Sequence, residues 1–282
     1  MMRDEELKQI FHIGWTNPNV VSHRVERFIK GEFGFAASRS AWLDVLRKTV
    51  PGEIPCKILD MGTGPGTIAL LWAELGHAIT GVDFSATMIS AGREAAKERG
   101  LTVDFVEADV EAPPFPENTF DIISSRAVLF TLPHPGYAVA QWIRLLKPGG
   151  VLVLIGENNP TDPEKLKRQH RPAPGWEPDE AYRNALEQLP FRSHTDGMVR
   201  VVMEAAGLRN IQNLPMQSVL AAREEHEQQN PNYGVLQGTP YVLTANRRIS
   251  QVELLSCQKQ IIFYDTAGKS LDISSSADTI TP

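Results

Sequence analysis

The sequence predicts an α/β protein with a doubly wound, mostly parallel sheet, in which helices cover both faces. One observation behind this prediction is a regular alternation: short apolar runs and helix-forming segments follow one another from residue 57 to residue 155. Another is the loop after the first apolar run, where an acid is followed by Gly62, Gly64 and Gly66. Glycine permits backbone angles that side chains forbid, and it lets a ligand approach the backbone closely.

The expected elements follow in order along the chain. Ser85 suits the N-cap of the second helix and Gly100 suits its C-terminal stop. Residues 147–150 suit a turn, and a later helix at 196–206 ends before Gly207. Strands are expected at 57–60, 77–82, 102–107, 120–124, 151–155, 208–212 and 240–245, with helices after the first, second and fourth strands at 68–76, 85–98 and 137–146.

Three further segments flank the expected sheet. Residues 1–50 are apolar at helical intervals and predict an N-terminal helical cap, which we expect to lie over a ligand crevice. Residues 157–196 are rich in proline and charge, and we interpret them as an insertion after the fifth strand that forms a lid, a surface loop being the alternative. The main domain is then 51–250. Residues 251–282 are expected to form a hairpin, from strands at 251–257 and 260–264, and a polar tail.

The composition is that of an ordinary globular protein, and it disfavours several kinds of partner. The chain has 282 residues, 42% of them hydrophobic, and a formal net charge of −6. This acidic balance disfavours non-specific binding of nucleic acid. Cys56 and Cys257 show no metal-ligand spacing, so we expect no metal and a reducing, cytoplasmic location. We expect no membrane span and no signal peptide, because no apolar run has the required length.

Acidic residues follow the second and third expected strands. Asp83 ends the second strand, where a carboxylate can accept hydrogen bonds from both hydroxyls of a ribose. A nicotinamide dinucleotide site and an adenosyl site both need such an acid. In the nicotinamide fingerprint, however, the third glycine stands one position further along than Gly66. Asp109, after the third strand, can accept the exocyclic amine of an adenine, which favours the adenosyl alternative.

Five motifs, in the order found here, resemble those of the class I S-adenosylmethionine-dependent methyltransferases. The resemblance covers residues 57–157 and implies a seven-stranded Rossmann-like methyltransferase fold, closed by an antiparallel pair of late strands. It also implies transfer of a methyl group from S-adenosyl-L-methionine to O, N or C of a small-molecule metabolite, leaving S-adenosyl-L-homocysteine. The motifs are Leu59-Asp60-Met61-Gly62-Thr63-Gly64-Pro65-Gly66, Gly81-Val82-Asp83-Phe84-Ser85 with Met88, Glu107-Ala108-Asp109, Phe120-Asp121-Ile122-Ile123-Ser124-Ser125-Arg126 and Leu146-Lys147-Pro148-Gly149-Gly150.

The resemblance implies a role for each matching residue. Asp60 and the backbone of the glycine loop would hold the methionine end of the cofactor, Asp83 would hold the ribose, and Asp109 would hold the adenine amine. We include Trp15 of the cap, whose alternative role is packing onto the sheet. The expected cofactor-binding set is Trp15, Asp60, Gly62, Gly64, Gly66, Asp83, Phe84, Met88, Asp109, Val110, Ser125 and Arg126.

The chemistry of methyl transfer limits what the protein has to supply. A sulfonium is already a strong electrophile, so the protein mainly aligns the acceptor and excludes water. A general base helps only if the acceptor loses a proton in the reactive step. The catalytic candidates are His12 on the cap, His134 after the fourth strand and Glu157 after the fifth. For each of them a structural role is the alternative.

Other functions stay open at this stage. The insertion carries a basic group, which would suit RNA or protein as the methyl acceptor. The fold can also serve as a non-catalytic module that binds the cofactor. A homodimer is one option for the oligomeric state, which the sequence does not determine. The basic group consists of Lys165, Lys167, Arg168 and Arg171.

Overall fold

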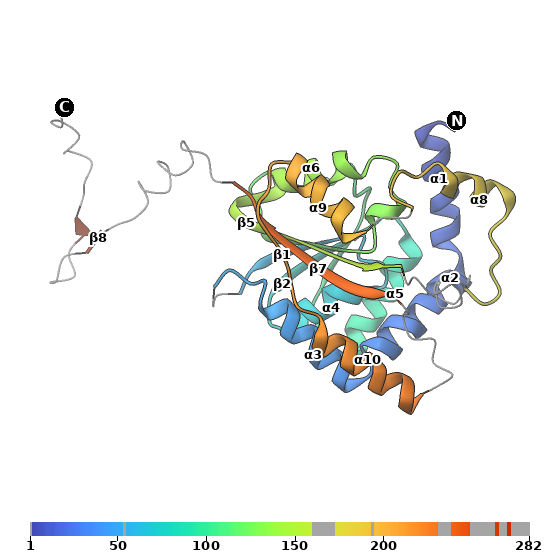
Figure 1. Ribbon diagram of the computed structural model, residues 1–282, viewed down its shortest axis with the longest axis horizontal. Coiled ribbons are helices and arrows are strands. Elements are labelled where there is room, and N and C mark those ends of the chain that lie inside the picture. Colours follow the sequence, from blue (N-terminus) through green and yellow to red (C-terminus); the bar gives the residue numbers. More distant parts are fainter. Residues whose placement is uncertain are drawn as a thin grey trace. The chain divides into compact units, whose positions relative to one another are not determined.

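The computed structural model describes residues 2–52, 55–159, 173–192, 195–230 and 238–248, together with the backbone of two short strands at 263–264 and 270–271. The chain divides into two compact units, residues 1–247 and 248–282. The first unit contains the sheet and the helices around it (Figure 1). The basic group of the insertion and the expected strand at 251–257 lie outside the described residues.

The first unit is built on a seven-stranded sheet, as the resemblance implied. Six strands run parallel to one another, and β7 alone runs antiparallel to its two neighbours, β5 and β6. The doubly wound, mostly parallel α/β fold is therefore confirmed. In spatial order the strands are β3 (Asp104–Glu107), β2 (Ala78–Asp83), β1 (Lys57–Met61), β4 (Phe120–Arg126), β5 (Leu146–Asn158), β7 (Thr239–Asn246) and β6 (Arg209–Asn213).

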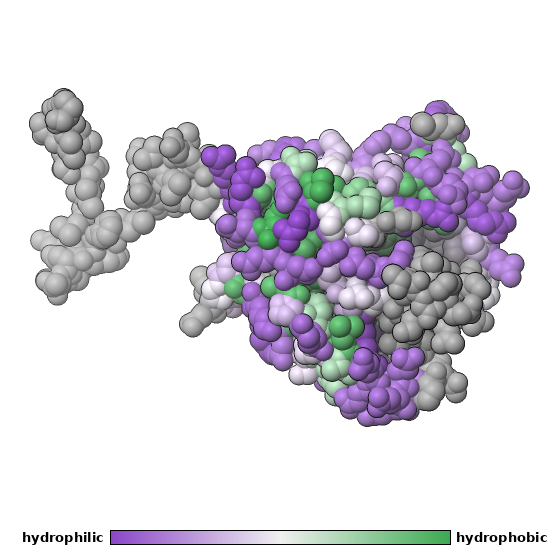
Figure 2. All heavy atoms as spheres, in the orientation of Figure 1, coloured by the Kyte–Doolittle hydropathy of each residue, from purple (hydrophilic) through white to green (hydrophobic). Residues whose placement is uncertain are grey.

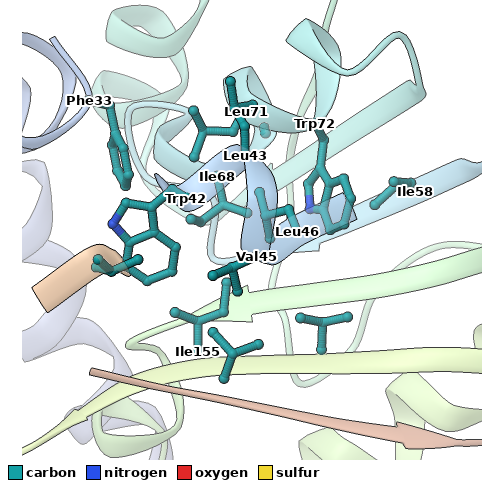
Figure 3. Packing of buried hydrophobic residues seen from close by; sticks show 14 of the residues in the cluster. Phe33, Trp42, Leu43, Val45, Leu46, Ile58, Ile68, Leu71, Trp72 and Ile155 are labelled. Atoms are coloured by element: carbon teal, nitrogen blue, oxygen red, sulfur yellow. The ribbon is translucent and has the colours of Figure 1, made fainter. Parts of the chain in front are cut away.

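Alternate residues of the central strands pack into separate hydrophobic cores on the two faces of the sheet. On one face Ile58 belongs to a cluster that contains Trp42 and Trp72 and includes residues of α3, α4 and α10 (Figure 3). On the other face Leu59 packs with Trp142 and with residues of α6 and α9. The helices are α3 (Ala36–Arg47), α4 (Thr67–Glu74), α5 (Ala86–Glu98), α6 (Pro135–Leu145), α9 (Asp196–Ala205) and α10 (Gln217–Gln229), and a 3₁₀ turn, η2, spans Leu129–Thr131.

The helix ends follow the local chemistry of the sequence. Ser85 caps α5, because its hydroxyl accepts a hydrogen bond from the amide of Met88, and Gly100 follows with φ of 63°. Gly207 after α9 likewise has a positive φ of 85°. The expected turn at 147–150 is wrong, because β5 already begins at Leu146 and pairs with Phe120 before the register shifts at Ile122. Those residues form an irregularity within the strand.

The cap consists of three helices and a π-helix. Asn17 ends α1 (Asp4–Thr16) and starts α2 (Pro18–Arg24), where its side chain accepts a hydrogen bond from the amide of Asn19. The π-helix η1 (Val25–Glu32) follows, and α3 completes the segment. Helix α8 (Glu180–Glu187), which belongs to the insertion, lies beside α1 (Figure 1). The two helices share a core of Leu7, Phe11, Ala185 and Leu189.

The outer surface is mixed in polarity. Figure 2 shows hydrophilic residues over much of the visible face, with apolar residues gathered over α6 and α9. Helix α9 buries Val199 and Met203 in the core and leaves Met198 and Val201 exposed. Among the described residues, no helix has the length and apolar character that crossing a membrane requires.

The second unit contains one short antiparallel pair of strands. Here β8 (Phe263–Tyr264) pairs with β9 (Ser270–Leu271). The sequence predicted strands at 251–257 and 260–264, whereas residues 263–264 pair with residues 270–271. The apolar residues Phe263 and Leu271 stand opposite each other, and this pairing extends the hairpin further along the chain than expected.

Candidate functional site

A cavity of about 380 Å³ lies between α1 and the carboxyl ends of the central parallel strands. This edge of the sheet is where ligands bind in open α/β folds, because the loops after successive strands meet there. The cap supplies one wall through Lys8, Phe11, His12 and Trp15. From the expected cofactor set, the lining includes Trp15, Asp60, Gly62, Gly64, Asp83, Phe84, Met88, Asp109, Val110 and Arg126. Two members of the set, Gly66 and Ser125, lie outside the lining residues.

The glycine loop has a backbone that only glycine adopts readily. Gly62 has φ of 64°, and a Cβ there would come within 2.3 Å of Val128 Cγ2. Gly64 has φ of 54°, and a Cβ there would meet no atom within 4 Å, although the residue lines the cavity. Gly66 is the left-handed N-cap of α4, so its role lies in the turn. The loop therefore leaves open space above its backbone at Gly64.

Asp83 at the end of β2 fixes this loop. Its Oδ2 accepts a hydrogen bond from the amide of Gly64 at 2.9 Å, and its Oδ1 accepts one from the amide of Ser85 at 2.9 Å. Burial raises the pKa of Asp83 to about 6, although these amides favour the charged form. Each oxygen keeps a further lone pair for a donor in the cavity.

Asp60 at the end of β1 is the second buried carboxylate of the site, with 2% of the residue exposed. The hydroxyl of Ser124 donates to its Oδ1 at 2.6 Å. Burial nevertheless raises the pKa of Asp60 to about 6. In the described part of the chain neither Asp60 nor Asp83 forms a salt bridge. Two buried carboxylates without a cation fit a ligand that brings a positive charge and hydroxyl donors.

Asp109 after β3 is joined to the cap by an ion pair. Its Oδ1 accepts from the amide of Glu111 at 2.8 Å, and its Oδ2 accepts from Lys8 Nζ at 2.7 Å. Lys8 also contacts the buried carboxylate of Glu111 at 2.5 Å. Lys8 could not be predicted from the sequence, because no motif distinguishes it from any other lysine on an amphipathic helix. An adenine amine at Asp109 would share the carboxylate with this lysine.

Aromatic and apolar residues surround the region between Asp83 and α1. The ring centroids of His12 and Phe84 lie 5.3 Å apart in a tilted arrangement. Met88 is buried, and the hydroxyl of Ser85 donates to the backbone carbonyl of Trp15 at 3.3 Å. His12 therefore stands beside the residues expected to bind the adenosyl group. Its charge would favour ionised Asp83.

Arg126 and Ser125 differ in how they meet the cavity. Arg126 is among the residues that line it, and its Nη2 donates to Glu32 Oε2 at 2.7 Å. Its guanidinium carbon lies 4.6 Å from the centroid of the Phe28 ring. The hydroxyl of Ser125 donates to the carbonyl of Met61 at 3.0 Å and ties β4 to β1.

Two of the three catalytic candidates lie outside the cavity lining. His134 is about half exposed, and its Nε2 lies 2.7 Å from Asp4 Oδ2. The side chain of Glu157 is 13% exposed, and its Oε1 accepts from Arg223 Nη2 at 2.9 Å. Burial raises the pKa of Glu157 against the attraction of Arg223. Only His12 lines the cavity, so the catalytic roles of all three stay predictions.

A buried charge network adjoins the cavity. Arg223 of α10 donates from Nε and Nη2 to Glu32 Oε1 at 3.0 and 2.7 Å. Burial alone would raise the pKa of Glu32, but the charges of Arg223 and Arg126 outweigh it and lower this pKa to about 2. The sequence did not reveal this network, because Glu32 and Arg223 are 191 residues apart. Their pairing depends on how α10 packs against the cap.

The arrangement defines a class of site. A glycine loop with open space at Gly64, carboxylates at successive strand ends and an aromatic wall are the features expected of the nucleoside-cofactor site of a class I methyltransferase fold. The carboxylate acceptors fit S-adenosylmethionine, because its ammonium and sulfonium are cations and its ribose hydroxyls are hydrogen-bond donors. Among the described residues, no group of three or more His, Cys, Asp or Glu side chains is arranged to hold a metal ion.

Comparisons with known proteins agree with this class. Residues 59–154 match the methyltransferase domain family. Demethylmenaquinone methyltransferase of Thermus thermophilus is 38% identical over 105 residues, which are 36% of this chain and 48% of that protein. The ubiquinone/menaquinone biosynthesis C-methyltransferase of Stutzerimonas stutzeri is 30% identical over 171 residues, or 55% of this chain and 66% of that one. The chain spans about half the length of the first of these relatives.

A solved structure shows the same fold. Phosphoethanolamine N-methyltransferase 2 of Haemonchus contortus, in complex with phosphomonomethylethanolamine and S-adenosylhomocysteine, superposes with a TM-score of 0.60 at 17% identity. The match covers 86% of this chain and 60% of that one. Residues 59–154 therefore match a methyltransferase domain, and the chain has the fold of the S-adenosylmethionine-dependent methyltransferases.

Proposed function

We propose that the protein transfers a methyl group from S-adenosylmethionine to a small-molecule acceptor. The observation that carries the proposal is the juxtaposition of Asp60, Asp83 and the open glycine loop around one cavity, which the cap covers. When bound, S-adenosylmethionine supplies a methyl group on a positively charged sulfur. The protein's own residues then have to hold the cofactor, orient the acceptor and keep water away.

The buried carboxylates bind the two polar ends of the cofactor. Asp83 accepts hydrogen bonds from the ribose hydroxyls while Gly64 and Ser85 hold it in place. Asp60 faces the ammonium of the methionine end, and the backbone of Gly62 and Gly64 approaches the same end. A cation at Asp60 favours the ionised carboxylate and offsets the cost of its burial.

The apolar residues hold the adenosyl group and the acceptor. Phe84, Met88 and Val110 pack around the adenine, and Asp109 accepts its amine beside Lys8. His12 lies beside Phe84 at the adenosyl end of the cavity. If His12 acts as a general base, the acceptor group that loses the proton therefore has to extend toward Phe84. Phe11 and Trp15 close the cavity on the cap side and exclude water from the reacting atoms.

The acceptor is a small molecule rather than a polymer. The cap forms one wall of the cavity, whose volume of about 380 Å³ suits a compact ligand. The two curated relatives are named for methylation of quinone precursors, but they match this chain over 36% and 55% of its length. Much of the acceptor side is built by residues outside the matched segment 59–154, such as Phe11 and Phe28. A quinone-like acceptor is therefore a candidate for the first assays. A cytoplasmic location also stays part of the proposal, and cell fractionation tests it.

Transfer of a labelled methyl group tests this function. The protein is incubated with cofactor labelled in the methyl group and with a metabolite panel that contains hydroxylated quinones, amines and phenols. We expect label in a small molecule, and no label when Asp60→Asn and Asp83→Asn are combined. The matched control is Asp121→Asn, which changes an aspartate at the other end of β4, where its Oδ2 accepts from the amide of Lys57.

The same experiment separates the alternatives. Label that appears only in added RNA or protein would contradict the small-molecule acceptor. Binding of the cofactor without transfer to any member of a broad panel would favour a non-catalytic module. Equal transfer by the double variant and the wild type would show that the two carboxylates do not hold the cofactor.

A further inference from the structure

Three arginines surround one phenylalanine at the acceptor side of the cavity. The guanidinium carbons of Arg24, Arg27 and Arg126 lie 5.5, 5.8 and 4.6 Å from the centroid of the Phe28 ring. Arg24 also lies 4.7 Å over the ring of Trp15. Arg24, Arg126 and Phe28 line the cavity. Cation–π contacts hold the side chains in place, but they do not neutralise the charges.

The charges of this arginine group are only partly paired. Arg126 uses Nη2 for Glu32, whereas its buried Nη1 has no hydrogen-bond partner. Arg27 Nε is likewise buried without a partner. Within the described residues Arg24 forms its aromatic contacts and no salt bridge. An unpaired donor of a buried guanidinium is costly, so these groups indicate an anion that the described part of the chain does not supply.

The local balance of charge supports the same conclusion. Adding Arg223 gives four arginines around this region, and the carboxylates between them are Glu32 and Glu157. Burial, together with the charge of Arg27, lowers the pKa of Arg24 to about 10. At neutral pH Arg24 therefore still carries its charge. Among the described residues of this region, four arginines therefore face two carboxylates.

The cofactor does not cancel this excess. Its amino-acid end carries one ammonium and one carboxylate, and the sulfonium adds a further positive charge. Asp60 is positioned for the ammonium and Asp83 for the ribose hydroxyls, and among the described residues neither carboxylate forms a salt bridge with these arginines. A methyl acceptor with a negative charge would balance the arginines and would be drawn into the cavity by them.

Resting on the proposed function, we propose that the methyl acceptor carries an oxyanion, a carboxylate or a phosphate, which Arg24 and Arg126 bind beside Phe28. Arginine pairs with both groups through two parallel N–H···O bonds, and the free Nη1 of Arg126 supplies one such donor. Phe28 and Trp15 contact the apolar part of the acceptor next to its acidic group. Arg27 adds positive charge behind them.

Ligand-observed NMR titration with small probes tests this site without knowledge of the acceptor. The probes are benzoate and phenyl phosphate, with benzamide as the neutral match in size, each titrated into the protein loaded with S-adenosylhomocysteine. We expect the anions to bind at least tenfold more tightly than benzamide. Arg24→Gln should abolish that preference, and Arg24→Lys should retain part of it. The control is Arg47→Gln on α3, an exposed arginine paired with Asp44, which should retain the full preference.

A second measurement shows whether Arg24 binds the anion of the acceptor or the carboxylate of the cofactor. Affinities for S-adenosylhomocysteine and for 5′-methylthioadenosine, which lacks the amino-acid part, are measured on wild type and Arg24→Gln. We expect Arg24→Gln to change both by less than twofold. Loss of tenfold or more for S-adenosylhomocysteine alone would assign Arg24 to the cofactor and overturn the proposal. Equal binding of benzoate and benzamide would also overturn it. If S-adenosylhomocysteine does not bind at all, the proposed function fails, while the probe titration on the unloaded protein still decides the anion site.

Discussion

Replacing Asp83 by asparagine should separate cofactor affinity from stability. Asparagine keeps the size of the side chain, but it removes the charge that the ribose hydroxyls would meet. A hydrogen bond to a charged group contributes about 1.5–3 kcal/mol, so the dissociation constant for S-adenosylhomocysteine should rise about 10- to 150-fold. The free energy of unfolding of the protein without cofactor should not follow this loss of affinity.

The stability of the variant follows from two opposing terms. The pKa of Asp83 is raised from 3.8 to about 6, so at pH 7 the buried charge costs about 3 kcal/mol relative to the neutral acid. Asparagine removes that cost. Its amide nitrogen, however, faces one of the two amides that now donate to the carboxylate, Gly64 or Ser85, at a cost of about 1–3 kcal/mol. The free energy of unfolding should therefore change by less than about 2 kcal/mol.

Calorimetric titration with S-adenosylhomocysteine and urea unfolding at pH 7.5 measure the two quantities. The control is again Asp121→Asn, because Asp121 also accepts a bond from a backbone amide but lies away from the cavity. The control should bind the cofactor product as the wild type does. An affinity of Asp83→Asn within twofold of the wild type would refute the ribose assignment. If Asp83→Asn loses affinity for S-adenosylhomocysteine together with a large part of its unfolding free energy, the two effects are not separate and the reasoning is refuted.

Four further predictions concern the pH dependence, the glycine loop and the buried charge network. Affinity for S-adenosylhomocysteine should fall below pH 6, about 100-fold by pH 5, because Asp60 and Asp83 both protonate near pH 6; a flat calorimetric profile from pH 5 to 7.5 would contradict this. In the cofactor-free protein the same raised pKa values mean that unfolding releases protons, so stability should decrease as pH rises from about 4 to 6. Gly62→Ala should lose about 1–3 kcal/mol of unfolding free energy through the clash with Val128, with partial recovery in the double variant with Val128→Ala; a fully stable single variant would disprove the clash. Glu32→Gln should cost about 3–5 kcal/mol in urea unfolding, because Arg126 and Arg223 lose their shared carboxylate, and a loss below 1 kcal/mol would show that the network is dispensable.

The main features of the sheet edge could be predicted from the sequence. Parallel strands present their carboxyl ends at one edge, so Asp60, Asp83 and Asp109, each placed at or just after a strand, had to come close together. The cap of α5 by Ser85 and the glycine loop are also local effects. Local chemistry and strand order are sufficient for these features.

Contacts between distant segments could not be predicted in this way. Lys8 meets Asp109 across 101 residues, and Glu32 meets Arg223 across 191. Both depend on how helices of the cap and α10 pack, and no sequence motif marks those helices. The expected strand at 151–155 made Glu157 a catalytic candidate just after its end, whereas Glu157 lies within β5 and is bound by Arg223. The strand extension at 146–150 was missed because Pro148 and the adjacent glycines are typical of turns.

A crystal structure with S-adenosylhomocysteine bound would test the central claim most directly. The account predicts the ribose hydroxyls within hydrogen-bond distance of Asp83, the ammonium at Asp60 and the adenine between Phe84 and Met88, with α1 closed over them. Density for the ligand anywhere else on the chain, or none in this cavity at saturating concentration, would contradict the account.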